Sequence, residues 1–156
     1  MVGVTSVAMI SGKDEMPVAY VVLDQGTLVL ELWVGAISHD EVLAHERRHL
    51  SDSSVIPGAS VLVDAISASF ETMPEMVQEV TDLYRRPVET LKVGKVALLV
   101  SASAYDHVQL YEKQASESGV RVIMFNSLDV ACTWLGIDGT RARQEFEKLR
   151  ANLALV

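Results

Sequence analysis

Apolar residues fall into short runs that are separated by turn-forming residues along most of the chain. The first run, Val18–Leu23, is followed by Asp24-Gln25-Gly26, which has turn chemistry. From Leu28 to Val34, leucines alternate with other residues, among them Glu31 and Trp33. This period of two is typical of a strand with one buried face and one partly solvated face. We therefore predict a β-hairpin over these two runs.

Three later apolar runs have apolar residues in succession, as strands do when both of their faces are covered. They are Ser60–Asp64, Lys95–Val100 and Val120–Phe125, and a helical pattern follows each of them. Strands that alternate with helices indicate right-handed crossovers and a parallel core. Together with the hairpin, these runs predict an α/β fold with a mixed, mostly parallel sheet of about five strands.

Capping and breaking residues mark five amphipathic helices. Ser38 and Glu41 have the spacing of a capping box, and Ser103 with Asp106 indicates a second capped start. Pro74 suits a first helical turn, because its missing N–H would be unpaired there. The predicted helices cover about 38–50, 74–86, 103–118, 127–135 and 140–153, with a loop over Ala65–Thr72.

The length of 156 residues fits one domain, and 49% hydrophobic with 22% charged residues is the range of globular proteins. Residues 1–16 are mixed in character, so we predict a loose N-terminal arm before a single α/β domain over 17–156. The formal net charge of −8 argues against nucleic acid and against an anionic membrane surface as partners. Cys132 is the single cysteine, which excludes an intramolecular disulfide and suits a reducing compartment. No signal sequence or membrane span is recognisable, and we expect a cytoplasmic protein without a cofactor.

The segment His45-Glu46-Arg47-Arg48-His49 matches H-E-x-x-H, the signature of zinc metalloproteases. On a helix its two histidines share a face and can hold one ion, with Glu46 as the base. Two arginines would place positive charges beside the ion, however, and apolar neighbours are sparse. Only His107 follows, and not at a motif spacing. We therefore interpret this segment as a solvated helix face with charge pairs. A zinc hydrolase that uses His45 and His49 remains a remote alternative.

Polar side chains follow the predicted parallel strands, where α/β proteins tend to bind ligands. Such a rim would contain Asp64, Ser67 and Ser69 after one strand, and Ser101 and Ser103 after the next. Helix capping by each serine is the favoured explanation, because the glycines that let a phosphate approach the backbone are absent there.

The order of elements resembles the SpoIIAA-like fold, a right-handed β–α superhelix. This fold is shared by anti-sigma-factor antagonists (STAS domains), CRAL-TRIO lipid-binding domains and small bacterial proteins of unknown function. The resemblance spans about Val18 to Gly136, and the segments that carry it are Gly35-Ala36-Ile37-Ser38, Val61-Leu62-Val63-Asp64, Val96-Ala97-Leu98-Leu99-Val100 and Val122-Ile123-Met124-Phe125-Asn126-Ser127 through Ala131 to Trp134-Leu135.

The resemblance implies a non-catalytic regulatory or binding module with a protein partner, or alternatively a CRAL-TRIO-like carrier of a lipid or small apolar ligand. STAS antagonists carry a phosphorylatable serine in an Asp-Ser-Ser-Gly turn, and here that turn falls at Glu71-Thr72-Met73-Pro74. The Ser-Ser-Gly is missing, so Thr72 is the one hydroxyl near the position. Partly apolar surface on the Glu31–Trp33 strand face and on the last helix also suggests a homodimer.

Overall fold

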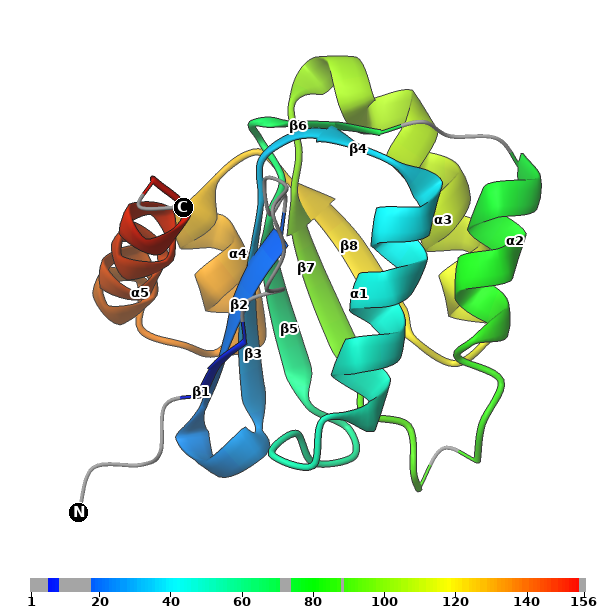
Figure 1. The fold of residues 1–156 in the computed structure, drawn as a ribbon, viewed down its shortest axis with the longest axis horizontal. Helices are drawn as coiled ribbons and strands as arrows, with labels where there is room; N and C mark the ends of the chain where they lie inside the picture. Colours follow the sequence, from blue (N-terminus) through cyan, green and yellow to red (C-terminus); the bar gives the residue numbers. More distant parts are fainter. Residues whose placement is uncertain (1–5, 9–17, 71–73, 88, 155–156) are drawn as a thin grey trace.

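A six-stranded sheet forms the centre of the molecule (Figure 1). The computed structural model describes residues 6–8, 18–70, 74–87 and 89–154. The strands of this sheet are β1 (Ser6–Ala8), β2 (Val18–Leu23), β3 (Leu28–Trp33), β5 (Ser60–Asp64), β7 (Lys95–Leu99) and β8 (Arg121–Phe125). They lie in the order β1-β2-β3-β5-β7-β8. The pairs β1–β2 and β2–β3 are antiparallel, and the remaining pairs are parallel.

The predicted α/β class and the mixed, mostly parallel sheet are confirmed. The strand β1 lies within the predicted N-terminal arm and pairs with β2, and the rest of residues 1–16 lies outside the described residues. A second sheet was not predicted: β4 (Gly35–Ile37) and β6 (Ala68–Phe70) pair in parallel beside the main sheet. The region from Ala65 to Phe70, predicted as loop, therefore contains a strand. Each of these strands has three residues, which is too short to show a hydrophobic period.

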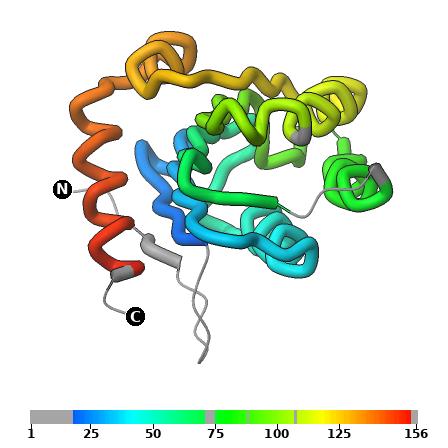
Figure 2. Tube along the Cα trace, turned by 90° about the horizontal axis from the view of Figure 1, so that it is seen from above, coloured from blue at the N-terminus to red at the C-terminus, as the bar shows by residue number. Residues whose placement is uncertain are grey.

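Helices cover both faces of the main sheet (Figures 1 and 2). They are α1 (His39–Ser51), α2 (Pro74–Asp82), α3 (Tyr105–Glu117), α4 (Leu128–Leu135) and α5 (Gly139–Ala154). The side chains of α1, α2 and α3 form one hydrophobic core with one face of the sheet. Those of α4 and α5 form a second core with the opposite face. Among the described residues, no helix is both long and apolar enough to cross a membrane.

Both faces of β3 are buried, which corrects the prediction of a partly solvated face. Leu30 and Leu32 pack into the core with α4 and α5. Glu31 and Trp33 point the other way and are each only 4% exposed. This strand face therefore offers no free surface for a second copy of the chain, and the homodimer remains a prediction without that support.

The helix ends confirm one predicted cap and correct another. The capping box at α1 is formed: the Glu41 amide donates to Ser38 Oγ at 3.2 Å, and the Ser38 amide donates to the Glu41 carboxylate at 3.0 Å. The predicted cap by Ser103 is wrong, because a 3-10 turn over Ala102–Ala104 precedes α3 and its first turn has no side-chain cap. Ser103 instead lies 3.0 Å from Ser101, hydroxyl to hydroxyl.

Candidate functional site

The histidines of the H-E-x-x-H segment lie one turn apart on α1 and face the sheet. His45 and His49 are each only 1% exposed. The prediction that they lie on a solvated helix face is therefore wrong. The apolar residues around them are supplied by the strands, and the sparse apolar pattern of α1 itself gives no sign of this burial.

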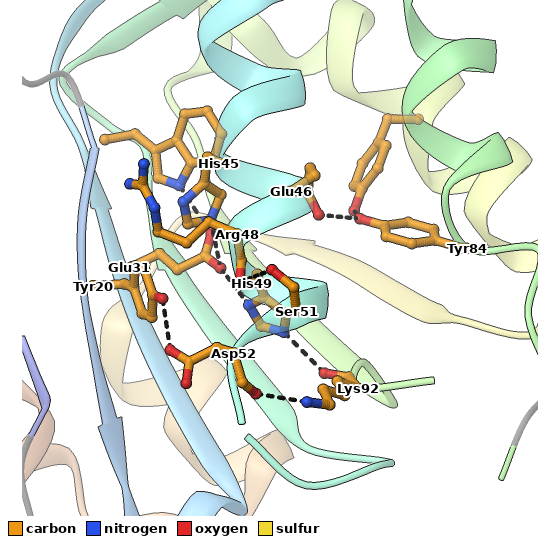
Figure 3. A network of polar contacts seen from close by, with 12 residues as sticks. Tyr20, Glu31, His45, Glu46, Arg48, His49, Ser51, Asp52, Tyr84 and Lys92 are labelled. Atoms are coloured by element: carbon orange, nitrogen blue, oxygen red, sulfur yellow. Dashed lines mark hydrogen bonds and ion pairs between the residues drawn. The ribbon is translucent and has the colours of Figure 1, made fainter. Parts of the chain in front are cut away.

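The partner of both histidines is Glu31 on β3 (Figure 3). One carboxylate oxygen, Oε2, lies 2.9 Å from His45 Nε2 and 3.3 Å from His49 Nδ1. Three ionisable side chains from two elements thus meet in the core between α1 and the sheet. Unpaired charge is costly at such a depth, so these groups depend on one another.

Two further contacts fix the orientation of the cluster. The Trp33 indole N–H donates to the other Glu31 oxygen at 3.0 Å. His49 Nε2 lies 2.8 Å from the Lys92 carbonyl oxygen. A carbonyl only accepts hydrogen bonds, so His49 Nε2 carries a proton and Nδ1 is the atom that faces Glu31.

The charges of the cluster stabilise one another. Burial alone would raise the pKa of Glu31, but the attraction of His45 and the close contact of both imidazoles with its carboxylate hold that pKa well below its usual range. Burial alone would lower the pKa of His49, whereas its hydrogen bond to Glu31 and the charges of Glu31 and Glu46 raise it to about 9. Both pKa shifts favour the charged forms of Glu31 and His49.

The glutamate of the segment points away from the histidines, toward α2 and α3 (Figure 3). The Tyr84 hydroxyl donates to the Glu46 carboxylate at 3.1 Å, and the Tyr111 hydroxyl lies 2.8 Å from that of Tyr84. Burial and the negative charge of Glu31 raise the pKa of Glu46. A metalloprotease needs this glutamate beside the metal-bound water. Here it is bonded to a tyrosine instead, and the arrangement of a hydrolase is not formed.

A mostly apolar cleft of about 120 Å³ lies between the sheet and the helices α1, α2 and α3. Valine and leucine side chains of β5, β7 and α2 form much of its wall, among them Val63, Val80 and Leu98. Its polar groups are few and include Glu46 and Tyr111. Such a lining is typical of a site for a small organic molecule, which a few polar groups orient.

The predicted rim residues that the structure describes lie at or after the carboxyl ends of β5 and β7, and none of them lines this cleft. Asp64 accepts from Arg150 on α5 at 3.3 Å and from the Ile66 amide at 3.2 Å, so it stabilises the fold. Ser67 and Ser69 are exposed. Thr72 lies outside the described residues. A role of Asp64, Ser67, Ser69, Thr72, Ser101 and Ser103 in partner binding stays a prediction.

Sequence reasoning missed the third member of the cluster. Glu31 sits in a strand whose other residues are apolar, and that position is a signal of buried charge. The alternation of the strand assigned it to a partly wet face instead. The site could have been predicted from two features together. One is the single carboxylate in an apolar strand, and the other is the pair of histidines at helical spacing.

Comparison with known proteins adds a likeness in fold. No protein-family model matches the chain, and no curated protein matches it significantly. Among solved structures, the chain is similar to an uncharacterised protein from the DUF3478 family with a SpoIIAA-like fold, from Shewanella loihica PV-4. The identity is 10% and the TM-score 0.47, over 84% of this chain and 93% of the other. The fold named for that protein is the SpoIIAA-like fold predicted from the sequence.

Proposed function

We propose that this domain is a binding module for a small, mostly apolar molecule, which it holds in the cleft between the sheet and α1, α2 and α3. The observation that carries the proposal is the lining of the cleft, with walls of valine and leucine and polar atoms from few residues. Water gains few hydrogen bonds in such a space, so an apolar group replaces it favourably.

The size of the cleft restricts the ligand. Its volume is about 120 Å³. A cavity of roughly 150 Å³ binds benzene, and clefts for drug-sized molecules measure about 300–1,000 Å³. The cleft therefore fits a single ring or a short branched chain. A whole lipid, as carried by CRAL-TRIO domains, is too large for the space described here.

The polar groups suggest how such a ligand is oriented. Glu46 and Tyr111 both line the cleft and are linked through the Tyr84 hydroxyl. Because its pKa is raised, Glu46 has a greater tendency to be protonated than an exposed glutamate. A neutral carboxyl group both donates and accepts a hydrogen bond. A ligand with one hydroxyl or amide group at the end of an apolar body complements this arrangement.

Binding without catalysis is the function that these groups support. The described part of the cleft brings no serine, threonine or cysteine into its lining. Of its two acidic groups, Glu46 is bonded to Tyr84, and Glu31 is engaged with Trp33 and the histidines. A covalent mechanism needs a nucleophile with a base in hydrogen-bond reach.

The proposal is tested by filling the cleft with a larger side chain. Val80 lines the cleft and is buried on α2, so Val80→Phe should occupy the space. Val130 on α4 is 55% exposed and belongs to the opposite layer, so Val130→Phe is the matched control. The probes are indole and benzyl alcohol, followed by ligand-observed NMR.

We expect saturable binding of at least one probe to the unchanged protein and to Val130→Phe, and its loss in a folded Val80→Phe protein. Circular dichroism and the melting temperature establish that each variant is folded. Equal binding by Val80→Phe would place the probe elsewhere and contradict the proposal, as would the absence of saturable binding to the unchanged protein.

A further inference from the structure

We propose that Glu31, His45 and His49 form a binding site for a divalent transition-metal ion of the Zn²⁺ type. Each of the three offers one ligating atom, and these atoms all lie within 4.8 Å of one another. All three residues are buried. The site is separate from the proposed ligand-binding function, although Glu31 also forms part of the cleft wall.

The distances between the ligating atoms suit a small ion. Metal–ligand bonds of about 2.0–2.2 Å in a tetrahedral arrangement place neighbouring ligand atoms roughly 3.3–3.5 Å apart. Glu31 Oε2 lies 3.3 Å from His49 Nδ1 and 2.9 Å from His45 Nε2. One contact already has the required spacing, and the other needs to widen by a few tenths of an ångström. The ion would lie between atoms that already converge.

The orientation of the His49 ring suits a metal ligand, because Nδ1 faces Glu31 while Nε2 faces the Lys92 carbonyl oxygen. Its Nε2–H donates to the Lys92 carbonyl oxygen, so a neutral His49 presents the lone pair of Nδ1 to the carboxylate of Glu31. Histidines that bind metals commonly donate their second N–H to a carbonyl in this way.

The burial and contacts of His45 Nε2 independently support a metal ion at this position. Its Nε2 is fully buried and lies 2.9 Å from Glu31 Oε2, but the two atoms are not aligned as a hydrogen bond. Within the described residues this nitrogen has no hydrogen-bond partner. A metal ion would satisfy this nitrogen and Nδ1 of His49 together.

The surroundings of the site answer the objection that the two arginines raise. Arg47 is exposed on α1, where solvent screens its charge. The ion-pair partners recorded for Glu31 are the two histidines, and Arg48 is not among them. The second Glu31 oxygen is held by Trp33, so the carboxylate is fixed with Oε2 toward the histidines.

Two imidazoles and one carboxylate select the kind of ion. This donor set suits Zn²⁺ and its neighbours Co²⁺ and Ni²⁺, whereas Ca²⁺ and Mg²⁺ prefer oxygen ligands throughout. Three protein ligands leave room for water in the fourth position of a tetrahedral ion. Because Glu46 is turned toward Tyr84, we assign the ion a role in joining α1 to β3 and not in hydrolysis.

The direct test is to add metal to the full chain in metal-free buffer. Zn²⁺ is titrated by competition with a chromophoric chelator, and Co²⁺ is followed through its visible absorption, which is strong for tetrahedral sites. We expect one ion per chain. In parallel, NMR of the four histidine side chains should show His45 and His49 shifting on addition of Zn²⁺, with His39 unchanged. This measurement needs no variant, so it decides the question even if the variants fail to fold.

Three variants locate the site. His45→Ala removes one ligand, and Glu31→Gln keeps the shape of the side chain but removes the charge. Each substitution should weaken zinc binding by more than about a hundredfold. That loss exceeds the roughly 10–100-fold loss of affinity that is typical when a group hydrogen-bonded to a metal ligand is removed. The control is His39→Ala on the same helix, since His39 pairs with Glu79 and lies outside the cluster. It should bind zinc as the unchanged protein does.

Two results would overturn the assignment. One is the lack of a stoichiometric zinc or cobalt complex of the unchanged protein, with no shift of His45 and His49. The other is equal metal binding by the folded Glu31→Gln variant, which would mean an adventitious ion at the surface. Neither result bears on probe binding in the cleft, so the two proposals fail or stand separately.

Discussion

Cys132 is a useful residue for testing the core on the α4 and α5 side of the sheet. Its side chain is 2% exposed, and burial together with the charge of Asp129 raises the pKa of the thiol. The thiolate is the reactive form. We expect a chromogenic disulfide reagent to react many times more slowly with the native protein than with the protein in urea, where the thiol is free. Similar rates in both states would mean that α4 does not cover Cys132.

The raised pKa of the Cys132 thiol also affects the stability of the protein at high pH. The unfolded chain has the lower thiol pKa, about 8.5, and therefore loses this proton first. The contribution of the neutral thiol to stability is fully present below that pH and decreases as the pH rises through the folded-state value.

Tyr84 is the central hydroxyl of the chain that runs from Tyr111 to Glu46. Tyr84→Phe leaves the half-buried Glu46 and Tyr111 without this partner, and it should lower the free energy of unfolding by about 1 kcal/mol. Urea denaturation measures the loss. Tyr105→Phe is the control, because Tyr105 is 48% exposed. Equal effects of the two substitutions would show that the hydroxyl chain contributes little.

At the scale of residues, the sequence showed part of the candidate site. The spacing of His45 and His49 predicted a shared helix face and named the two atoms that the structure brings together. Their burial and the role of Glu31 could not be predicted, because both depend on α1 packing across β3. Local periodicity contains no information on which helix covers which strand face.

At the scale of elements, the beginning of α1 rests on Ser38. Ser38→Ala removes one half of the capping box and should cost about 0.5–2 kcal/mol of stability. Thermal denaturation is a sufficient measurement. Ser103→Ala is a matched control, because Ser103 is exposed and caps no helix in the structure. A larger loss in Ser103→Ala than in Ser38→Ala would contradict this account of the helix start.

The long elements were predictable, whereas the short strands β4 and β6 were not. The apolar runs and the cap at Ser38 located strands and helices that the structure confirms. The sequence pattern predicted that α2 extends to Arg86, whereas the helix ends at Asp82. The strands β4 and β6 exist through their pairing with each other. Neither contains enough residues to carry a signal of its own.

At the scale of the whole molecule, α5 attaches the C-terminal part of the chain to the hairpin near its beginning. Phe146 and Leu149 pack against the leucines of β2 and β3, and Arg141 pairs with Asp24 at 2.6 Å. Phe146→Ala should lower the free energy of unfolding by about 3–5 kcal/mol, as is typical for a buried phenylalanine. Chemical denaturation tests this, with the exposed Val130→Ala as the control. A loss below about 1 kcal/mol would mean that the site collapses around the missing ring or that α5 docks loosely.

The docking of α5 also has a consequence for synthesis on the ribosome. One face of the β2–β3 hairpin is covered by α5, which emerges after all of the other described elements. At about 5–20 residues per second, the leucines of that face wait many seconds for their cover. During this interval the nascent chain exposes the apolar face of a strand pair. Chaperones that recognise extended apolar segments can bind this face before α5 packs against it.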